Sequence, residues 1–316
     1  MSFQRRTVNP TVRDRLLKRL PCPSTAGEPL AMHTTFRIGG PAEVFAQPRT
    51  VAELAEALRI ARDEQVPLFY LGLGSNLLVS DDGFDGLVIR AQGELCRMRM
   101  QGNLVCSGPG ARLLDLTGFV AVRGLSGMEP LSGIPGSVGG GLYMNAGAYG
   151  GEIADTFLEA DALLDDGRVR TLQRADIRFG YRRAPELASV IILESRYGLR
   201  SGDSRRIYAE MRRVWKLRRA KQPLDFPSAG SIFKRPPGDF AGRLIEAVGG
   251  KGARIGGAMV STKHAGIFVN SGGATAADVA ALVRQIRQRV YEEFHVLLEP
   301  EVKPVGFKED PFAIAS

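Results

Sequence analysis

The sequence predicts a mixed fold of the α+β class, and three observations support this prediction. In the first third, a helical pattern is followed by a short β-favouring run and a glycine loop. Between about residues 90 and 200, short apolar runs separated by turns indicate mostly strands. In the last third, apolar residues return to helical spacing over longer segments. At 316 residues, the chain has room for roughly two domains of ~150 residues each.

The first third shows one clearly marked helix. Thr50 and Glu53 have the spacing of a capping box, and apolar residues follow at helical spacing. The β-favouring run after this helix stops at Gly72. The expected elements are a helix at 51–64 and strands at 66–71 and 86–90.

The remaining two thirds predict a strand-rich middle and a more helical end. Pro223 and Pro227 interrupt the helical pattern after Lys221, so 221–230 is a plausible domain boundary. The expected helices are 113–123, 204–221, 239–248 and a long one from Thr275. The expected strands are 104–106, 160–164, 169–172, 190–195 and 267–270, with an extended tail at 297–306.

Composition excludes several classes of protein. Hydrophobic residues at 44% and charged residues at 24% argue against disorder, collagen and coiled coils. No apolar run approaches the ~18 residues of a membrane helix, and residues 1–7 lead into no apolar signal-peptide core. We therefore expect Arg5 and Arg6 to be a solvated pair and not an export signal. Three cysteines without a CxxC pattern and three scattered histidines predict neither disulfides nor a metal site. We expect a cytoplasmic monomer.

Two glycine-rich segments indicate close approach of backbone to a ligand. The segment 72–77 resembles GxGxxG, but Leu77 replaces the third glycine and a strand is expected after it, so a Rossmann site is excluded. The segment 131–151 is dense in glycine and has no charged side chain. It predicts a wall pressed against a flat ligand, although tight turns in a β-rich domain would give the same composition.

Seven segments, taken in this order, resemble the UDP-N-acetylenolpyruvoylglucosamine reductase family, flavoenzymes that complete UDP-N-acetylmuramic acid for peptidoglycan. Together they extend from about residue 33 to residue 306, which makes them far more specific than either glycine loop. The matching segments are 33–42 (HTTFRIGGPA), 72–79 (GLGSNLLV), 133–150, 179–182 (FGYR), 229–236 (AGSIFKRP), 254–270 and 298–303 (LEPEVK).

This resemblance implies an FAD-binding fold of the vanillyl-alcohol-oxidase type, built from two subdomains, plus a smaller α+β substrate-binding domain. The implied boundaries are 1–90 for the first subdomain, with the tail 301–316 returning to it, 91–220 for the second, and 221–300 for the substrate domain. In the family, NADPH reduces FAD and leaves, and the enolpyruvyl sugar nucleotide then takes a hydride from flavin N5. The FAD is expected to be non-covalent, because neither His33 nor Cys22 lies in an attachment motif.

Positions that match the family's FAD-binding segments are the cofactor-binding candidates. They are Arg37, Gly72, Gly74, Ser75, Asn76, Leu77, Gly133, Ile134, Pro135, Gly136, Ser137, Gly139, Gly140, Asn145, Ala146 and Gly147.

Three further matches are the catalytic candidates. Arg182 matches the arginine that would grip and polarise the substrate carboxylate, since hydride addition to an enol ether needs that carboxylate to accept charge. Ser231 matches the serine proton donor, and Lys234 is a plausible aid to its ionisation. Glu301 matches the catalytic glutamate, although Glu299 is its rival because alternating positions share a face.

Lys221 and His264 match positions that line the sugar-nucleotide pocket in the family, and Lys234 and Arg235 are further substrate-binding candidates. The chain departs from the usual pattern at Arg235, where many relatives have asparagine, and at Ala184, where a serine often follows FGYR. The short path from Arg182 to the next helix suggests the shorter type of the family, without an extra tyrosine-bearing loop.

Two other functions compete with this interpretation. The net charge is +8, and eight Lys or Arg residues between 205 and 221 could form a nucleic-acid stripe, but few aromatics and no nucleic-acid motif accompany them. We therefore expect a small-molecule UDP-sugar and NADPH as partners, with neither nucleic acid nor membrane insertion. The nearer alternative is an FAD-linked oxidase or dehydrogenase of the same fold that acts on a hydroxy acid or sugar.

Overall fold

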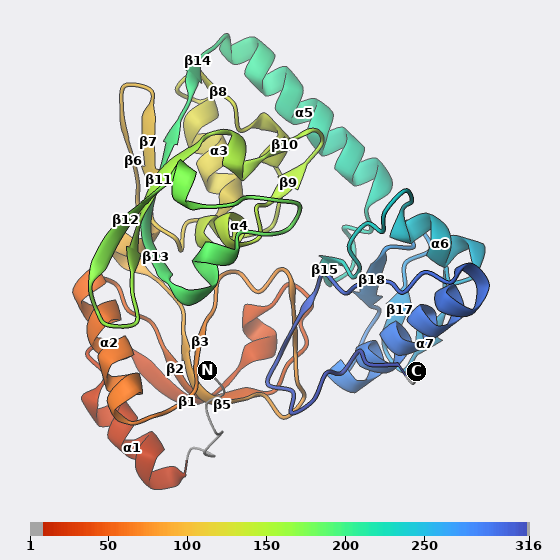
Figure 1. Cartoon of the computed structure of the whole chain (residues 1–316), viewed down its shortest axis with the longest axis horizontal. Helices are drawn as coiled ribbons and strands as arrows, with labels where there is room; N and C mark the ends of the chain where they lie inside the picture. The colour runs from red at the N-terminus through yellow and green to blue at the C-terminus, as the bar shows by residue number, and fades with distance from the viewer. Residues whose placement is uncertain (1–8, 315–316) are drawn as a thin grey trace. The chain divides into compact units, whose positions relative to one another are not determined.

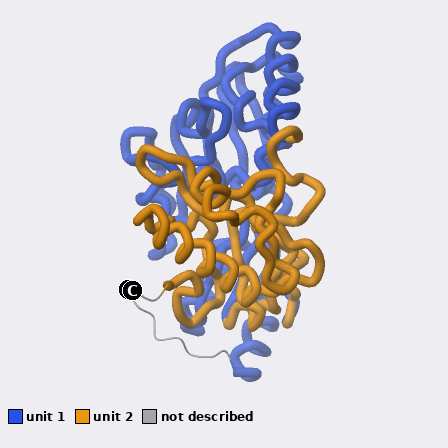
Figure 2. Tube along the Cα trace, turned by 90° about the vertical axis from the view of Figure 1, so that its right-hand side faces the viewer, with its two compact units in different colours: residues 1–26, 44–73, 86–218 blue, residues 27–43, 74–85, 219–316 orange. Residues whose placement is uncertain are grey.

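The computed structural model describes residues 9–314. The expectations of a solvated Arg5–Arg6 pair and of no signal peptide at residues 1–7 therefore lie outside the described residues. Two compact units interleave along the sequence (Figure 2). Unit 1 comprises 1–26, 44–73 and 86–218, and unit 2 comprises 27–43, 74–85 and 219–316. The expected domain boundaries at residues 90, 220 and 300 remain a prediction.

An antiparallel five-stranded sheet forms the centre of unit 1 (Figure 1). Its order is β12-β11-β13-β7-β6, and Tyr197, Phe157 and Leu116 are buried in the core beside it. The strands are β6 (Met98–Gln101), β7 (Leu104–Ser107), β11 (Phe157–Leu163), β12 (Val169–Gln173) and β13 (Ile191–Gly198). Helices α3 (Leu113–Ala121) and α4 (Val138–Tyr143), with the short pairs β8 (Leu125–Ser126)/β14 (Arg200–Ser201) and β9 (Gly147–Ala148)/β10 (Gly151–Glu152), complete this part.

Helices α1 (Pro10–Arg19) and α2 (Val51–Asp63) form a second core of unit 1, where Leu16, Leu54 and Ile60 pack with Leu87 and Ile89. Thr50 caps α2 by accepting a hydrogen bond from the Glu53 amide, as the sequence predicts. The neighbouring sheet has the order β1-β2-β5-β3. Its strands are β1 (Ser24–Pro29), β2 (Pro41–Ala46), β3 (Leu68–Tyr70) and β5 (Phe84–Ile89).

Unit 2 is built on an antiparallel sheet of order β15-β18-β17-β16. Phe268 from this sheet and Val279, Ile286 and Leu298 from the following segments share its core. The elements are β15 (Ser228–Ser231), α6 (Ala241–Ala247), β16 (Arg254–Ile255), β17 (Ala258–Val260), β18 (Ile267–Asn270) and α7 (Ala276–Phe294). A parallel pair, β4 (Leu77–Val79) with β19 (Lys303–Val305), joins two distant parts of the sequence.

The N-terminal end of α7 is capped twice. Thr275 and Asp278 form a capping box, and the Asp81 carboxylate accepts hydrogen bonds from the amides of Ala276 (2.8 Å) and Ala277 (3.0 Å). Because these amides have no partner within the helix, a carboxylate there satisfies them and complements the helix dipole.

The α+β prediction is confirmed, and most expected elements are present with shifted ends. Helix α5 (Ser204–Lys221) has the predicted bounds.

Two helices of the described residues were not predicted. Helix α1 begins at Pro10 and is capped by Asn9, a pattern typical of a helix start. Helix α4 lies inside the glycine-rich segment. Short 3₁₀ turns occupy Leu30–His33, Gly93–Cys96, Glu129–Leu131, Ile153–Asp155, Arg174–Asp176 and Pro185–Ser189. Within residues 9–314, no helix is both long and apolar enough to cross a membrane.

Candidate active site

The first glycine loop, 72–76, connects β3 to β4, so a strand follows it as the sequence predicts. The backbone N–H groups of these five residues donate to no acceptor among residues 9–314. Successive amides that are not engaged within the protein can bind an anion. This set of donors fits the diphosphate of FAD.

Two glycines in this loop are required by close packing. A Cβ on Gly72 would lie 2.3 Å from Ser137 Oγ, so the two glycine-rich segments touch each other in unit 1. Gly74 has φ +61°, and a Cβ there would lie 2.3 Å from the His33 carbonyl oxygen. Gly72 therefore packs against Ser137 within unit 1, and Gly74 packs against the His33 backbone within unit 2.

The second glycine segment contains a short helix, and its expected contact with a flat ligand remains a prediction. Ser137 Oγ accepts a hydrogen bond from the Gly140 amide (3.2 Å) and starts the short helix α4. Gly139 packs against Pro109, and Gly141 packs against Leu113. A Cβ on either glycine would lie 2.8 Å from the side chain of its neighbour, so only glycine fits at these two positions without a shift. Part of the glycine content thus serves close packing inside the protein.

The loop before α4 holds the remaining candidates of this segment. Gly133 has φ +83°, and the Gly136 carbonyl accepts a hydrogen bond from the Leu113 amide (2.8 Å). Ile134 is half-buried, and its carbonyl accepts from the Gly136 amide across Pro135 (2.9 Å). These contacts fix the loop's backbone within unit 1; its contacts with FAD remain a prediction.

Arg182 lies at the tip of a tight turn. The amide and carbonyl groups of Gly180 and Arg183 pair across it, and Arg182 adopts φ +54°. Asn145 is fully buried and holds this turn, since its Nδ2 donates to the Gly180 carbonyl oxygen (3.0 Å) and its Oδ1 accepts from the Ala154 amide (3.3 Å). The Arg182 guanidinium donates to the Gly147 carbonyl oxygen (3.1 Å). Asn145 thus helps to position the turn, and its expected contact with FAD remains a prediction.

Ser231 and Glu301 come together in unit 2. The Glu301 amide donates to the carbonyl oxygen of Ile232, the residue after Ser231 (2.7 Å). Ser231 is exposed, and its hydroxyl makes no hydrogen bond within the described part of the chain. Gly230, with φ +73°, lies at an irregularity in the pairing of β15 with β18 just before it.

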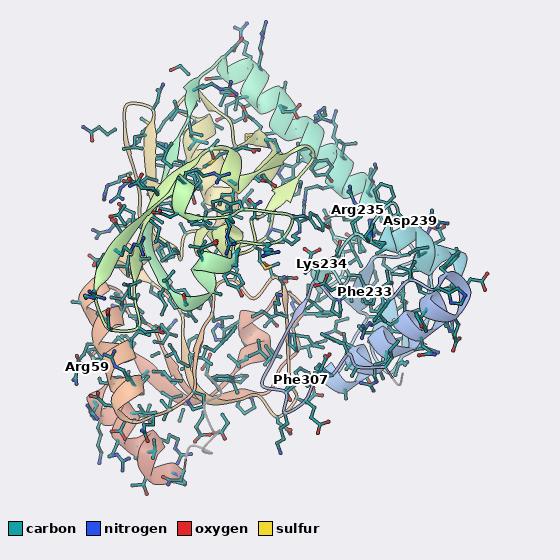
Figure 3. All side chains as sticks on the ribbon, viewed as in Figure 1. Arg59, Phe233, Lys234, Arg235, Asp239 and Phe307 are labelled. Carbon is teal, nitrogen blue, oxygen red and sulfur yellow. The ribbon has the colours of Figure 1, made fainter. Side chains whose placement is uncertain are left out.

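Burial separates Glu301 from its rival. Glu301 is 8% exposed, whereas the side chain of Glu299 is 68% exposed and pairs with the ammonium group of Lys234. Figure 3 labels Lys234 between Phe233 and Arg235, in the segment that follows β15. These contacts favour Glu301 as the shielded carboxyl group. They also engage Lys234 with Glu299, not with Ser231.

Asn76 links the first glycine loop to this carboxyl group. Its Nδ2 donates to the Glu301 carbonyl oxygen (3.1 Å), and its own carbonyl oxygen accepts from the Lys303 amide (2.9 Å). Leu77 continues this contact by pairing with Lys303 in the parallel ladder. Two residues predicted to bind FAD therefore also hold the segment that carries Glu301.

The remaining candidates occupy different parts of the surface. His264 is half-buried; burial, followed by the charges of Lys251 and Lys221, lowers its pKa, and its Nδ1 accepts from the Gly266 amide (3.2 Å). Lys221 is exposed at the end of α5, and Arg235 stacks on the ring of Phe240 at 4.6 Å. Arg37 is exposed in a turn at φ +56°.

One charged residue near the glycine loop was missed by the sequence analysis. Arg218 is only 7% exposed and has no hydrogen bond or salt bridge among residues 9–314. Burial lowers its pKa, opposed by the nearby Tyr149, and its Nε would lie 3.2 Å from a Cβ on Gly133. The only signal in the sequence was its place in the basic run of α5, where it was counted among eight residues that could form a nucleic-acid stripe. Within the same described range, no cluster of three metal-ligating side chains occurs.

Comparison with known proteins covers most of the chain. Residues 42–173 match the family described as "FAD binding domain", and residues 222–305 match "UDP-N-acetylenolpyruvoylglucosamine reductase, C-terminal domain". UDP-N-acetylenolpyruvoylglucosamine reductase 2 of Symbiobacterium thermophilum is 47% identical over 280 residues, which are 88% of this chain and 91% of the relative. The Alkaliphilus oremlandii reductase is 44% identical over 280 residues, 88% of this chain and 92% of its own.

A solved structure gives the same result for the fold. The crystal structure of UDP-N-acetylenolpyruvylglucosamine reductase from Thermus caldophilus matches with a TM-score of 0.77 and 37% sequence identity. The match covers 90% of this chain and 98% of the Thermus chain. Together with the identities above, this match shows that the chain belongs to the UDP-N-acetylenolpyruvoylglucosamine reductase family.

Proposed function

We propose that this chain is an FAD-containing oxidoreductase that reduces UDP-N-acetylglucosamine enolpyruvate to UDP-N-acetylmuramate, a step of peptidoglycan precursor synthesis. Membership of the reductase family supports this activity, with 47% identity over 88% of the chain. The observation that carries it is the hydrogen bond between the Glu301 amide and the Ile232 carbonyl oxygen, which joins the segment of the expected proton donor, Ser231, to the segment of Glu301.

The residues that would hold FAD fit its chemistry. Amides of 72–76 offer successive donors to a diphosphate, and Arg218 places a buried positive charge beside the Gly133 loop. When bound there, FAD would supply a hydride carrier between a nicotinamide and a second substrate. We take NADPH as that reductant, as the family's behaviour implies.

Arg182 would bind the substrate carboxylate. A guanidinium can donate two parallel hydrogen bonds to a carboxylate, which fixes the carboxylate and stabilises the charge it gains during hydride addition. The left-handed turn and the buried Asn145 bond hold Arg182 in one backbone conformation. A left-handed backbone conformation is strained for an arginine, and it persists where the surrounding contacts hold it in place.

Ser231 and Glu301 would handle the proton. Reduction of the enolpyruvyl group leaves its second carbon to be protonated, and the exposed Ser231 hydroxyl is available to a substrate. Glu301, shielded from solvent, would donate a hydrogen bond to the developing enolate if it enters the reaction protonated. Lys234 would assist Ser231 only if it released Glu299.

Cationic side chains would bind the sugar nucleotide. Lys221, Lys234 and Arg235 would supply charge to its diphosphate, and His264 would serve as a neutral hydrogen-bonding group. We further propose that the enzyme works as a cytoplasmic monomer of the shorter family type. Its partners would then be small molecules alone.

An anaerobic spectroscopic experiment tests this function. Purified protein should show a flavin spectrum that NADPH bleaches and that the enolpyruvyl sugar nucleotide restores. Reduction by a hydroxy acid or sugar, with no response to NADPH, would instead identify the FAD-linked oxidase alternative. Protein that binds no flavin after reconstitution would contradict both functions.

A further inference from the structure

The buried arginine of α7 contacts the segment that carries Glu301. Arg287 is 8% exposed, and its Nε donates to the Leu298 carbonyl oxygen (2.9 Å). Its Nη1 donates to the Phe312 carbonyl oxygen. One guanidinium thus joins two chain segments that follow α7, and Leu298 is three residues before Glu301.

Burial of a charge is expensive unless it makes specific contacts. Arg287 forms no salt bridge with any residue in the described range, and burial lowers its pKa while Asp310 opposes the shift. A methionine of similar length would fill this volume without the desolvation cost. What a guanidinium adds is a rigid fork of donors that holds two carbonyl groups at once.

The segment 298–303 is held from both ends. At its start, Arg287 bonds to Leu298, and the Lys234 amide donates to the Glu299 carbonyl oxygen (2.9 Å). At its end, Asn76 bonds to the Glu301 carbonyl oxygen (3.1 Å). These contacts fix the backbone at Leu298, Glu299 and Glu301, and with it the point from which the Glu301 side chain extends.

We propose that Arg287 is a positioning residue for Glu301: by holding the Leu298 carbonyl, it sets the direction from which the carboxyl group meets the substrate. This inference rests on the proposed function of Glu301. The proposed reaction has two separable halves, and only the second, in which the sugar nucleotide is reduced, uses Glu301. Loss of Arg287 should therefore affect that half alone.

The test measures both half-reactions on the flavin-loaded full chain by anaerobic stopped flow. In Arg287→Met, flavin reduction by NADPH should stay within about twofold, whereas reoxidation by the sugar nucleotide should slow about tenfold to a hundredfold, the cost of a small misplacement. KM for the sugar nucleotide should change little while kcat falls. Arg287→Lys, which keeps a charged donor, should recover part of the rate.

Arg284→Met is the matched control. Arg284 lies one turn earlier on α7 and donates to the Pro311 carbonyl oxygen (2.6 Å) but not to Leu298. Both half-reactions should stay near the unmodified rates in this variant. If Arg287→Met does not fold with flavin bound, the same comparison is made with Arg287→Lys, whose single ammonium group cannot reproduce the fork.

Glu301→Gln separates this inference from the proposed function. If Glu301→Gln slows reoxidation but neither Arg287 variant does, the positioning role of Arg287 is wrong and the proposed function stands. The same conclusion follows if the Arg287 variants slow flavin reduction and reoxidation equally. If Glu301→Gln leaves reoxidation unchanged, the acid assignment itself is wrong, and the positioning role is lost with it.

Discussion

At the scale of single residues, positive φ angles coincide with the proposed chemistry. Six described non-glycine residues have φ above zero, and Arg37, Asn145, Tyr149 and Arg182 of these lie in segments of the family pattern. The other two, Gln65 and His295, follow helix ends, where a left-handed residue is common. Left-handed φ is costly for residues other than glycine, so its presence at Arg182 supports a functional constraint there.

Exchanging each of the two neighbouring glutamates should separate their roles. Glu301→Gln should lower product formation about 10²-fold to 10⁴-fold, the usual contribution of general acid catalysis. Glu299→Gln should stay within about threefold, because Glu299 is exposed and forms only a surface ion pair with Lys234. Steady-state rates of both variants check this, with the flavin spectrum as the control for cofactor binding. Equal losses in both variants would contradict the assignment.

His264 should make stability depend on pH in a defined direction. Its pKa is lowered in the folded state by burial and by nearby lysines, so the unfolded state binds the proton more readily. The contribution is fully present above about pH 6.5, the unfolded pKa, and is lost as pH falls through the lower folded pKa. Urea unfolding at pH 7.5 and 5.5 should show a smaller fall in free energy for His264→Gln than for the unmodified chain. An equal fall would show that His264 is not responsible.

At the scale of elements, helices with apolar residues at helical spacing were predicted well and glycine-rich backbone was not. The Thr50 capping box is visible in the sequence, and α2 and α7 begin where expected, whereas α1 was missed although Asn9 caps it. Helix α4 lacks the apolar periodicity that would predict a helix, because three of its six residues are glycines. Two of them, Gly139 and Gly141, pack closely against Pro109 and Leu113. Contacts such as Asn76 to Glu301, 225 residues apart, are decided by tertiary structure and leave no local pattern.

Two glycines in neighbouring helices should respond oppositely to alanine. Gly118→Ala in α3 should stabilise the fold by about 0.5–1 kcal/mol, since nothing lies within 4 Å of the new Cβ and alanine favours helix. Gly139→Ala in α4 should destabilise it by about 1–3 kcal/mol, because the new Cβ would come 2.8 Å from the Pro109 side chain. Urea denaturation measures both changes. A stabilising Gly139→Ala would show that the loop around Pro109 yields easily.

At the scale of the whole molecule, the two units cannot be separated by cutting the chain once. Unit 2 takes residues 27–43 and 74–85 from the first third of the sequence. The first segment contributes the Thr35 carbonyl oxygen, which accepts a hydrogen bond from the Ser228 amide. The second contributes β4, which pairs with β19, and Asp81, which caps α7. The order of the family segments predicts only the return of the tail 301–316, and not that 27–43 and 74–85 belong with unit 2.

A fragment of residues 219–316 should therefore fail to fold alone. Without the two early segments, the parallel pair loses one strand and α7 loses one of its caps. Circular dichroism during urea titration should show no cooperative transition for the fragment, in contrast to the full chain. A cooperative transition would mean that the early segments add little to unit 2.

The side chain of Asn76 has a consequence for how variants of this enzyme are interpreted. It belongs to the loop whose amides fit a diphosphate, yet its amide group holds the backbone of Glu301. Free energies of Asn76→Ala and Glu301→Gln should therefore not be additive in a double-mutant cycle, because residues that share a contact are coupled. A reduced rate in an Asn76 variant would thus report on proton transfer as well as on flavin affinity, and only the cycle would apportion the two.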